Sequence, residues 1–219
     1  MSSCIQKIVQ LAKVAATHKA PFELDEHLLK ALNSLTIHEL YFDPREPFES
    51  HNGLPAYYVD IHEDQHLSIG IFFLNGSTKI PLHDHPHMTG IIKCIAGNLN
   101  IVSFSPLQEL NDDNDPSSTI IALPHETLTL SSSSEPKMLT PNSRNIHEVQ
   151  NTSKSSLAAF LDILTPPYNI PDQSEFSPNE GVRPCNYYEI VKKETDSVSL
   201  RIVEKPDEFI CRSYKFFSY

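Results

Sequence analysis

The sequence predicts a mainly β protein, a sandwich or barrel preceded by helices. From residue 56 onward, short runs rich in β-branched and aromatic residues are separated by turn-forming residues. These runs are AYYVDI, HLSIGIFFL, TGIIKCIA, NLNIVSF, TIIALP, ETLTL, SLAAFLDIL, YYEIV, SLRIV and FICRSYKFF. Alternating β/α units would instead place helical patterns between the strands. The 219 residues suffice for one large all-β domain with a sizeable core.

Two helices are expected before the strands. Over residues 3–17 one helical face carries the apolar side chains Ile5, Ile8, Val9, Ala12, Ala15 and Ala16. A shorter helix is predicted over 23–33, with inward-facing Leu24, Leu28, Leu29 and Leu32. Residues 36–55 contain three prolines and a glycine and are interpreted as irregular surface chain. We therefore expect a helical segment over 1–55 packed on a barrel over 56–219, in a single domain overall.

Three connections between the strands have recognisable turn chemistry. Gly97-Asn98 separates two apolar runs and predicts a hairpin over IIKCIAGNLNIVSF. Residues 105–118 are acidic and contain prolines, which is typical of a mobile loop. Ser131–Ser134 is a second turn.

Charge and composition exclude several classes of partner. The formal net charge of −11 argues against nucleic acid or an anionic membrane as the main partner. No apolar run reaches the roughly 20 residues of a membrane span, and MSSCIQKIVQ lacks the blocks of a signal peptide. The cysteines Cys4, Cys94, Cys185 and Cys211 have neither zinc-knuckle spacing nor disulfide-scaffold density. We expect a reduced, monomeric protein in the cytoplasm, with the nucleus as an alternative.

A His-x-His pair is the first candidate for a metal site. His83 and His85 would fall on the same side of an extended strand, close enough to share one ion. His147, in NIHEVQN, lies in another strand-like segment. Imidazole is the commonest metal ligand, and three imidazoles leave open coordination positions, as a catalytic site requires. A surface pair of histidines remains the alternative for the first two.

The motifs around these histidines resemble those of a known family. His83-x-His85, four residues, Gly90, six residues and Gly97 follow the first cupin motif, and His147 with Asn151 resembles the second. IPLHDHPHM, FLDILTPPY and CNYY are similar to segments of the cysteamine (2-aminoethanethiol) dioxygenase and plant cysteine oxidase family. The resemblance extends from CIQKI through Tyr188.

This resemblance implies a fold, a cofactor and a reaction. The fold is a cupin-type double-stranded β-helix, a jelly-roll barrel, with the helices outside. The cofactor is Fe(II), held by His83, His85 and His147. The reaction inserts both atoms of O₂ into the sulfur of cysteamine or of a protein N-terminal cysteine, giving a sulfinic acid. Another cupin enzyme and a non-catalytic metal-binding cupin remain alternatives.

Further residues acquire roles through the same resemblance. Asp162, between apolar neighbours, is expected beside the metal, where it orients a histidine or receives the substrate ammonium. A structural hydrogen bond is the alternative. Tyr168 follows two prolines and is expected at the pocket or packed in the core. Cys185 and Tyr187 share a strand face and would lie near the metal, where the family's pair can form a thioether, or the cysteine is simply buried.

Two positions near the His-x-His pair depart from the motifs. Gly90 stands where the cupin motif usually carries a metal-binding glutamate, so that a thiolate ligand would be favoured. His87 stands where this family usually has glycine. It extends the alternation of His83 and His85, but Pro86 has no N–H for a ladder and should end the strand. A fourth ligand and a place at the pocket mouth are both open for His87.

Overall fold

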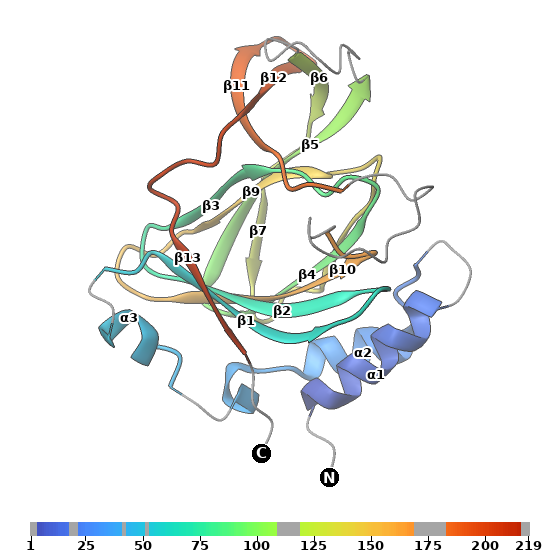
Figure 1. Ribbon diagram of the computed structural model, residues 1–219, viewed down its shortest axis with the longest axis vertical. Helices are drawn as coiled ribbons and strands as arrows, with labels where there is room; N and C mark the ends of the chain where they lie inside the picture. Colours follow the sequence, from blue (N-terminus) through green and yellow to red (C-terminus); the bar gives the residue numbers. More distant parts are fainter. Residues whose placement is uncertain are drawn as a thin grey trace.

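The computed structural model describes residues 4–17, 22–40, 43–50, 53–108, 119–168 and 183–215. Two β-sheets face each other, and helices cover the outer face of one of them (Figure 1). The first sheet has six strands in the order β13-β1-β2-β10-β4-β8, and the second has seven in the order β6-β12-β11-β3-β9-β5-β7. The predicted mainly β fold class is confirmed.

The strands of the first sheet are β1 (Ala56–Glu63), β2 (Ser68–Leu74), β4 (Thr89–Ala96), β8 (Lys137–Leu139), β10 (Ala158–Thr165) and β13 (Cys211–Lys215). The strands of the second sheet are β3 (Lys79–His83), β5 (Asn98–Gln108), β6 (Thr119–Pro124), β7 (Leu128–Ser131), β9 (Ile146–Asn151), β11 (Tyr187–Lys193) and β12 (Val198–Val203). β13 runs parallel to β1, and every other pairing is antiparallel among the described strands.

The chain repeatedly crosses from one sheet to the other. Strands β3, β4 and β5 lie in the second, first and second sheet, and β8, β9, β10 and β11 alternate in the same way. This double crossing is the topology of a double-stranded β-helix, the jelly roll. A further pairing of β6 with β5 closes a ring of six strands, β5, β6, β12, β11, β3 and β9. Its interior holds an apolar cluster that includes Leu82, Phe104 and Leu200.

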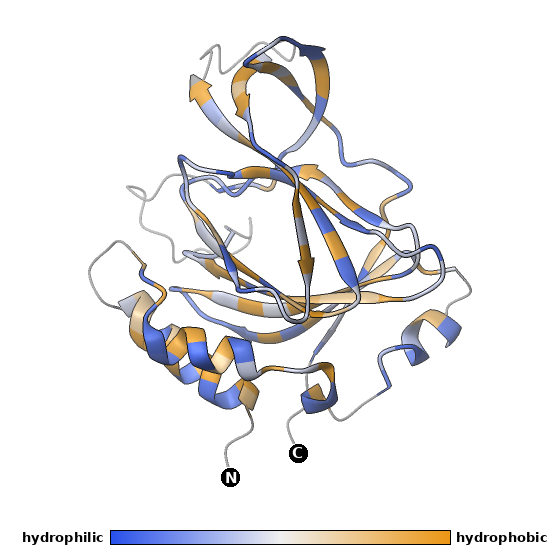
Figure 2. Cartoon of the chain, turned by 180° about the vertical axis from the view of Figure 1, so that it is seen from behind, coloured by the Kyte–Doolittle hydropathy of each residue, from blue (hydrophilic) through white to orange (hydrophobic). Residues whose placement is uncertain are grey.

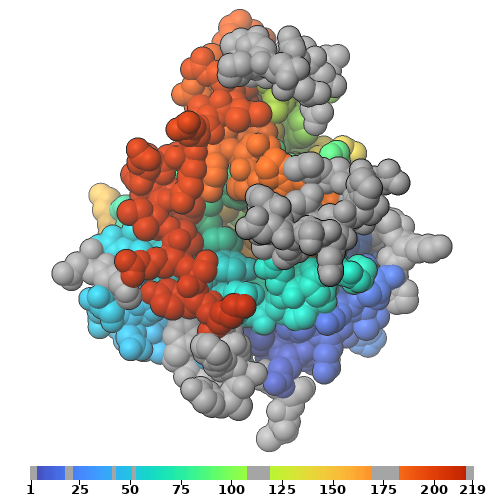
Figure 3. All heavy atoms as spheres, in the orientation of Figure 1, coloured from blue at the N-terminus to red at the C-terminus, as the bar shows by residue number. Residues whose placement is uncertain are grey.

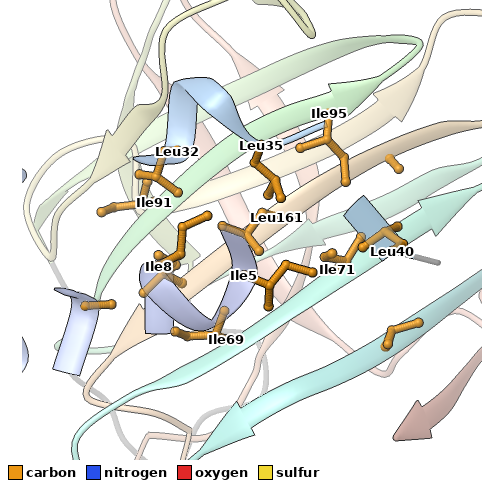
Figure 4. Packing of buried hydrophobic residues seen from close by; sticks show 14 of the residues in the cluster. Ile5, Ile8, Leu32, Leu35, Leu40, Ile69, Ile71, Ile91, Ile95 and Leu161 are labelled. Carbon is orange, nitrogen blue, oxygen red and sulfur yellow. The ribbon is translucent and has the colours of Figure 1, made fainter. Parts of the chain in front are cut away.

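Helices α1 (Cys4–Thr17) and α2 (Glu26–Ser34) cover the outer face of the first sheet. Ile5 and Ile8 of α1 and Leu32 of α2 point at the isoleucines of β2 and β4 and at Leu161 of β10 (Figure 4). Hydrophilic residues alternate with these hydrophobic ones along both helices, as the amphipathic pattern requires (Figure 2). The first sheet is therefore buried on both faces, which explains the nearly unbroken apolar sequence of β10.

Several local predictions are wrong in instructive ways. The second helix begins at Glu26 rather than residue 23, because the Asp25 side chain caps it by accepting from the Leu28 amide at 2.7 Å. Residues 36–55 are not wholly irregular: they contain the 3₁₀ helix η1 (Ile37–Leu40) and α3 (Glu46–Ser50). Leu40 and Phe48 anchor these short helices in the core.

The connections were predicted less well than the strands. Gly97-Asn98 does not close a hairpin, because β4 and β5 hydrogen-bond into different sheets; the chain turns a corner there, with Gly97 at φ 68°. Strand β5 continues through Gln108, and residues 109–118 of the predicted loop lie outside the described residues. The turn at Ser131–Ser134 is confirmed. Within the described ranges, no helix combines the length and apolar run that crossing a bilayer requires.

Candidate metal centre and pocket

Three histidines meet between the two sheets. His83 ends β3 opposite His147 of β9, and one ligand-capable atom from each of His83, His85 and His147 lies within 4.8 Å of the others. All three side chains are buried. His85 was expected inside the strand, but β3 ends at His83 because residues 85–88 form a turn in which the Met88 amide donates to the His85 carbonyl at 3.1 Å. The predicted grouping of the three imidazoles is nevertheless present.

Two of the histidines use Nδ1 to bind backbone carbonyls. The Nδ1–H of His83 donates to the Pro81 carbonyl at 2.8 Å, and that of His147 donates to the Asn145 carbonyl at 3.3 Å. A proton on Nδ1 leaves the lone pair on Nε2. Both rings are thereby fixed in the tautomer that can bind a metal through Nε2.

The third histidine is oriented through a tyrosine. His85 Nδ1 lies 2.7 Å from the hydroxyl oxygen of Tyr168, and that hydroxyl donates its own proton to the Asp84 carbonyl. The hydroxyl has only one proton, so His85 must be the donor in the first of these bonds. His85 therefore also has Nε2 free.

Burial keeps the cluster uncharged. It lowers the pKa of His83 to about 4, and burial together with the neighbouring imidazoles lowers the pKa values of His85 and His147 well below the usual range. Neutral imidazoles with free Nε2 atoms suit iron, zinc, copper or nickel. The donor set therefore fits a divalent transition metal.

An asparagine ties two of the histidine-bearing segments together. The Asn145 side chain accepts from the His85 amide at 3.0 Å and donates to the His85 carbonyl at 2.7 Å. Its own backbone carbonyl accepts from His147, as described above. Asn145 is 4% exposed. It was not predicted from the sequence, although it lies two residues before His147, the spacing of side chains on one side of an extended chain.

Asp84 was also not predicted from the sequence. It stands between His83 and His85 in the chain, and its side chain points away from the cluster that those two histidines face. Its carboxylate accepts from the backbone and side-chain N–H groups of Asn186, at 2.9 and 3.0 Å, and from the Tyr188 hydroxyl at 2.7 Å. Asn186 and Tyr188 alternate with Cys185 and Tyr187. The buried carboxylate therefore holds the segment that carries those two pocket residues against the histidine turn.

A cavity of about 340 Å³ opens beside the histidines. The first sheet supplies one wall, through Tyr58, Ser68, Phe72, Asp162, Leu164, Cys211 and Ser213. The second sheet and the adjoining loops supply the other, through Ile80, His83, His85, Pro167, Tyr168, Cys185 and Tyr187. The volume lies within the range of about 300–1,000 Å³ that ligand pockets occupy.

Asp162 projects into this cavity from β10. Among the described residues no hydrogen bond reaches its carboxylate, so the structural hydrogen bond considered from the sequence is not found there. Burial raises the pKa of Asp162 to about 7. Tyr58 lies close by, because its ring covers Gly70, the β2 residue paired with Asp162. A Cβ at that glycine would come within 2.1 Å of the tyrosine ring.

Tyr168, Cys185 and Tyr187 gather on the other wall. The Cys185 thiol makes hydrogen-bonding contacts with the hydroxyls of both tyrosines. Burial raises the pKa of this thiol to about 11, although the residue as a whole is exposed. The ring centroid of Tyr187 is 6.4 Å from that of His83. All three residues line the cavity.

The departures at Gly90 and His87 both have a structural explanation. A Cβ on Gly90 would lie 3.2 Å from Leu164 and 3.3 Å from Leu139, so apolar side chains occupy the space next to this position. His87 is exposed in the turn after β3, with φ 58°, a conformation that glycine adopts without strain. His87 belongs neither to the histidine cluster nor to the described lining of the cavity.

A jelly-roll barrel with three inward-facing histidines beside a ligand-sized cavity defines a cupin-type protein with a candidate metal site. The chain belongs to the PCO_ADO family, which matches residues 24–215. Similar proteins carry the names 2-aminoethanethiol dioxygenase and plant cysteine oxidase.

Three relatives illustrate the likeness. The 2-aminoethanethiol dioxygenase of Mus musculus is 30% identical, over 88% of this chain and 81% of that protein. Its Homo sapiens counterpart is 31% identical over 63% of this chain and 53% of that protein. Plant cysteine oxidase 1 of Arabidopsis thaliana is 31% identical over 68% of this chain and 46% of that protein.

Solved structures overlap less well. A cupin superfamily protein from Desulfitobacterium hafniense gives a TM-score of 0.36 at 10% identity, over 51% of this chain and 78% of that one. The strand order described above, rather than this overlap, defines the fold.

Proposed function

We propose that this chain is an Fe(II)-dependent thiol dioxygenase that converts a 2-aminoethanethiol unit to the sulfinic acid. The unit is cysteamine itself or the N-terminal cysteine of a protein. The observation that supports this proposal is a set of three neutral imidazoles next to a cavity that contains Asp162. Each imidazole forms a hydrogen bond through Nδ1 and has Nε2 free. Three such ligands leave positions open for a thiol and O₂.

The metal and the residues divide the work. Iron, when bound by His83, His85 and His147, supplies the redox chemistry that passes both atoms of O₂ to sulfur, so that RSH and O₂ give RSO₂H. Zinc would fit the same nitrogens but has no redox chemistry. Tyr168 holds the His85 ring through its hydrogen bond. Apolar side chains of the lining, Phe72, Ile80, Leu164 and Phe209, exclude water.

Asp162 receives the substrate amine in this proposal. Its carboxylate faces the cavity with no described hydrogen-bond donor, so an arriving ammonium supplies the missing partner. The positive charge also lowers the pKa of the carboxyl and favours the ionised form. Cys185 and Tyr187 form the wall on the other side. An intact-mass measurement tests whether a thioether joins these two residues.

Peptide N-termini suit the cavity as well as cysteamine does. A volume of about 340 Å³ exceeds what cysteamine fills, so the carbonyl side of a longer substrate has room. We therefore expect both peptides with an N-terminal cysteine and cysteamine to be oxidised. Oxygen-dependent turnover of a protein N-terminus would make the enzyme an oxygen sensor that feeds protein degradation.

Mass spectrometry of a peptide with an N-terminal cysteine tests the reaction. Aerobic incubation with iron-loaded protein should add two oxygen atoms, and ¹⁸O₂ should label both. Zinc-loaded protein is the matched control and should leave the peptide unchanged. Oxidation of neither the peptide nor cysteamine by iron-loaded protein would exclude the proposed activity and favour a non-catalytic metal-binding cupin.

Asp162→Asn tests the amine site within the same assay. Asparagine keeps the size but removes the charge, so bound iron should remain while kcat/KM for cysteamine falls by about 10- to 100-fold, the range for a hydrogen bond to a charged group. Iron content measured on the same sample separates this from a folding defect. Unchanged turnover would make Asp162 structural only.

A further inference from the structure

One cation stands out among the described residues that line the cavity. Lys205 lies in the connection between β12 and β13 and contributes to the cavity wall together with Phe209, while the acidic lining residues are Glu63 and Asp162. The C-terminal segment that carries it runs down one face of the molecule beside the strand region that follows residue 183 (Figure 3). Neither the motifs nor the proposed reaction uses this lysine.

Lys205 is held at the cavity without an acidic partner. Its Nζ lies 5.5 Å from the centroid of the Phe209 ring, a cation–π contact. Glu204, Asp207 and Glu208 are its close neighbours in sequence, yet Lys205 forms no ion pair with any residue in the described part of the chain. Burial raises the pKa values of the Cys185 and Cys211 thiols, and the charge of Lys205, which lines the same cavity, lowers them in part.

The proposed substrate leaves one group without a recognised partner. Its thiol goes to the histidines and its amine to Asp162, but cysteine also carries a carbonyl or carboxylate on the same carbon as the amine. An oxygen acceptor there matches an ammonium donor. We propose that Lys205 is a specificity-determining residue that binds this oxygen, which is present in free cysteine and in N-terminal cysteine peptides and absent from cysteamine. The inference rests on the function proposed above.

Kinetics of three substrates with one variant test the inference. Lys205→Met keeps an apolar stem but removes the charge. For a peptide with an N-terminal cysteine, for free cysteine, or for both, KM should rise about two- to fivefold, the size an exposed charged contact supplies, while kcat stays unchanged. Cysteamine should show no change. Lys205→Arg should restore the low KM, and Lys192→Met, at an exposed lysine paired with Glu194, is the matched control.

The substrate affected identifies the source of the oxygen. If KM rises only for the peptide, Lys205 contacts the peptide carbonyl. If KM rises only for free cysteine, Lys205 contacts the carboxylate. Salt should diminish the difference between wild type and Lys205→Met, because exposed charges are screened. Equal changes for all three substrates, or no change for either cysteine substrate, would overturn the inference.

A binding measurement separates this inference from the proposed reaction. Calorimetric titrations of zinc-loaded protein with the same peptide and, separately, with free cysteine under argon give Kd values without turnover. Weaker binding by Lys205→Met, restored in Lys205→Arg, supports the lysine contact even if no oxidation is found. Identical Kd values of wild type and Lys205→Met for both ligands overturn it even if the enzyme is an active dioxygenase.

Discussion

The interior between the two sheets has a closed end, filled by apolar side chains, and an open end, which contains the cavity and the three histidines. The same strands supply residues to both ends. On β10, Phe160 and Asp162 share one face, yet Phe160 packs in an apolar cluster and Asp162 projects into the cavity. On β3, Ile80 belongs to that cluster as well as to the cavity wall, whereas His83 joins the candidate metal site. Moving two or three residues along a strand therefore passes from core to candidate active site.

This contrast shows how the fold supports polar groups that are costly to bury. At the closed end, dense apolar packing fixes β10 and β4 relative to each other. At the open end, the buried polar groups Asn145 and Asp84 have hydrogen-bond partners, while Asp162 faces the cavity. The closed end should therefore control stability, and the open end metal binding and turnover.

Removing one metal ligand should have the largest effect. His83→Ala, His85→Ala or His147→Ala each leaves two imidazoles, so iron retention and thiol oxidation should both be abolished while the fold persists. Iron content per chain, measured alongside circular dichroism, checks this.

His87→Gly is the matched control at the same turn. The exposed side chain at φ 58° contributes no ligand in our assignment, and glycine relieves the strain. The variant should keep its iron and activity. Loss of iron as complete as in His83→Ala would show that the ligand set is wrong.

At the closed end, Phe160→Ala should cost stability rather than chemistry. Phe160 is 2% exposed and stacks on Phe72, with the ring centroids 5.2 Å apart. Truncation should therefore lower the free energy of unfolding by about 3 to 5 kcal/mol. Denaturant unfolding measures the loss. Below the unfolding transition the variant should still bind one iron per chain, and loss of the metal from folded protein would contradict the division between the two ends.

Asn145→Ala should weaken metal binding without removing a ligand. The change deletes both hydrogen bonds to the His85 backbone, and loss of a partner that orients a ligand typically costs about 10- to 100-fold in metal affinity. Competition with a chelator measures the affinity. Asn100→Ala, on the partly exposed side of β5, is the control and should leave it unchanged. Equal affinities of Asn145→Ala and wild type would show that backbone packing alone positions His85.

The parts predictable from sequence were those with a local signal. Alternating β-rich runs indicated most strands, and the His-x-His spacing paired His83 with His85, while the resemblance to the second cupin motif added His147. The corner at Gly97 was predicted as a hairpin. Turn residues indicate that the chain changes direction, but they do not determine which sheet the next strand joins. Sheet membership depends on pairings far apart in the chain, such as β4 with β10.

The supporting residues of the site were missed for a related reason. Asp84 and Asn145 are ordinary polar residues until the fold brings each against a distant partner, Asn186 and the His85 backbone. Lys205 is likewise one of many charged residues in an acidic segment. Their contacts depend on the three-dimensional arrangement, which no short motif encodes.

The last predicted effect depends on pH, and it concerns Asp162 in metal-free protein. Burial raises the pKa of Asp162 to about 7 from the ordinary 3.8. Between these values the folded state binds more protons than the unfolded state, so the Asp162 contribution to the free energy of unfolding falls as pH rises and levels off above about 7. Asp162→Asn abolishes this dependence. Relative to wild type, the variant should therefore gain about 3 kcal/mol between pH 5 and pH 8.

Urea unfolding of both proteins at the two pH values, with chelator present, measures that gain. Asp196→Asn removes an exposed carboxylate and should show no comparable gain. If the difference between Asp162→Asn and wild type is the same at pH 5 and pH 8, the carboxylate is ionised in the folded protein throughout that range. The cavity would then already solvate the charge, and Asp162 would face the open end of the barrel as an ordinary aspartate rather than as a group that requires a cationic partner.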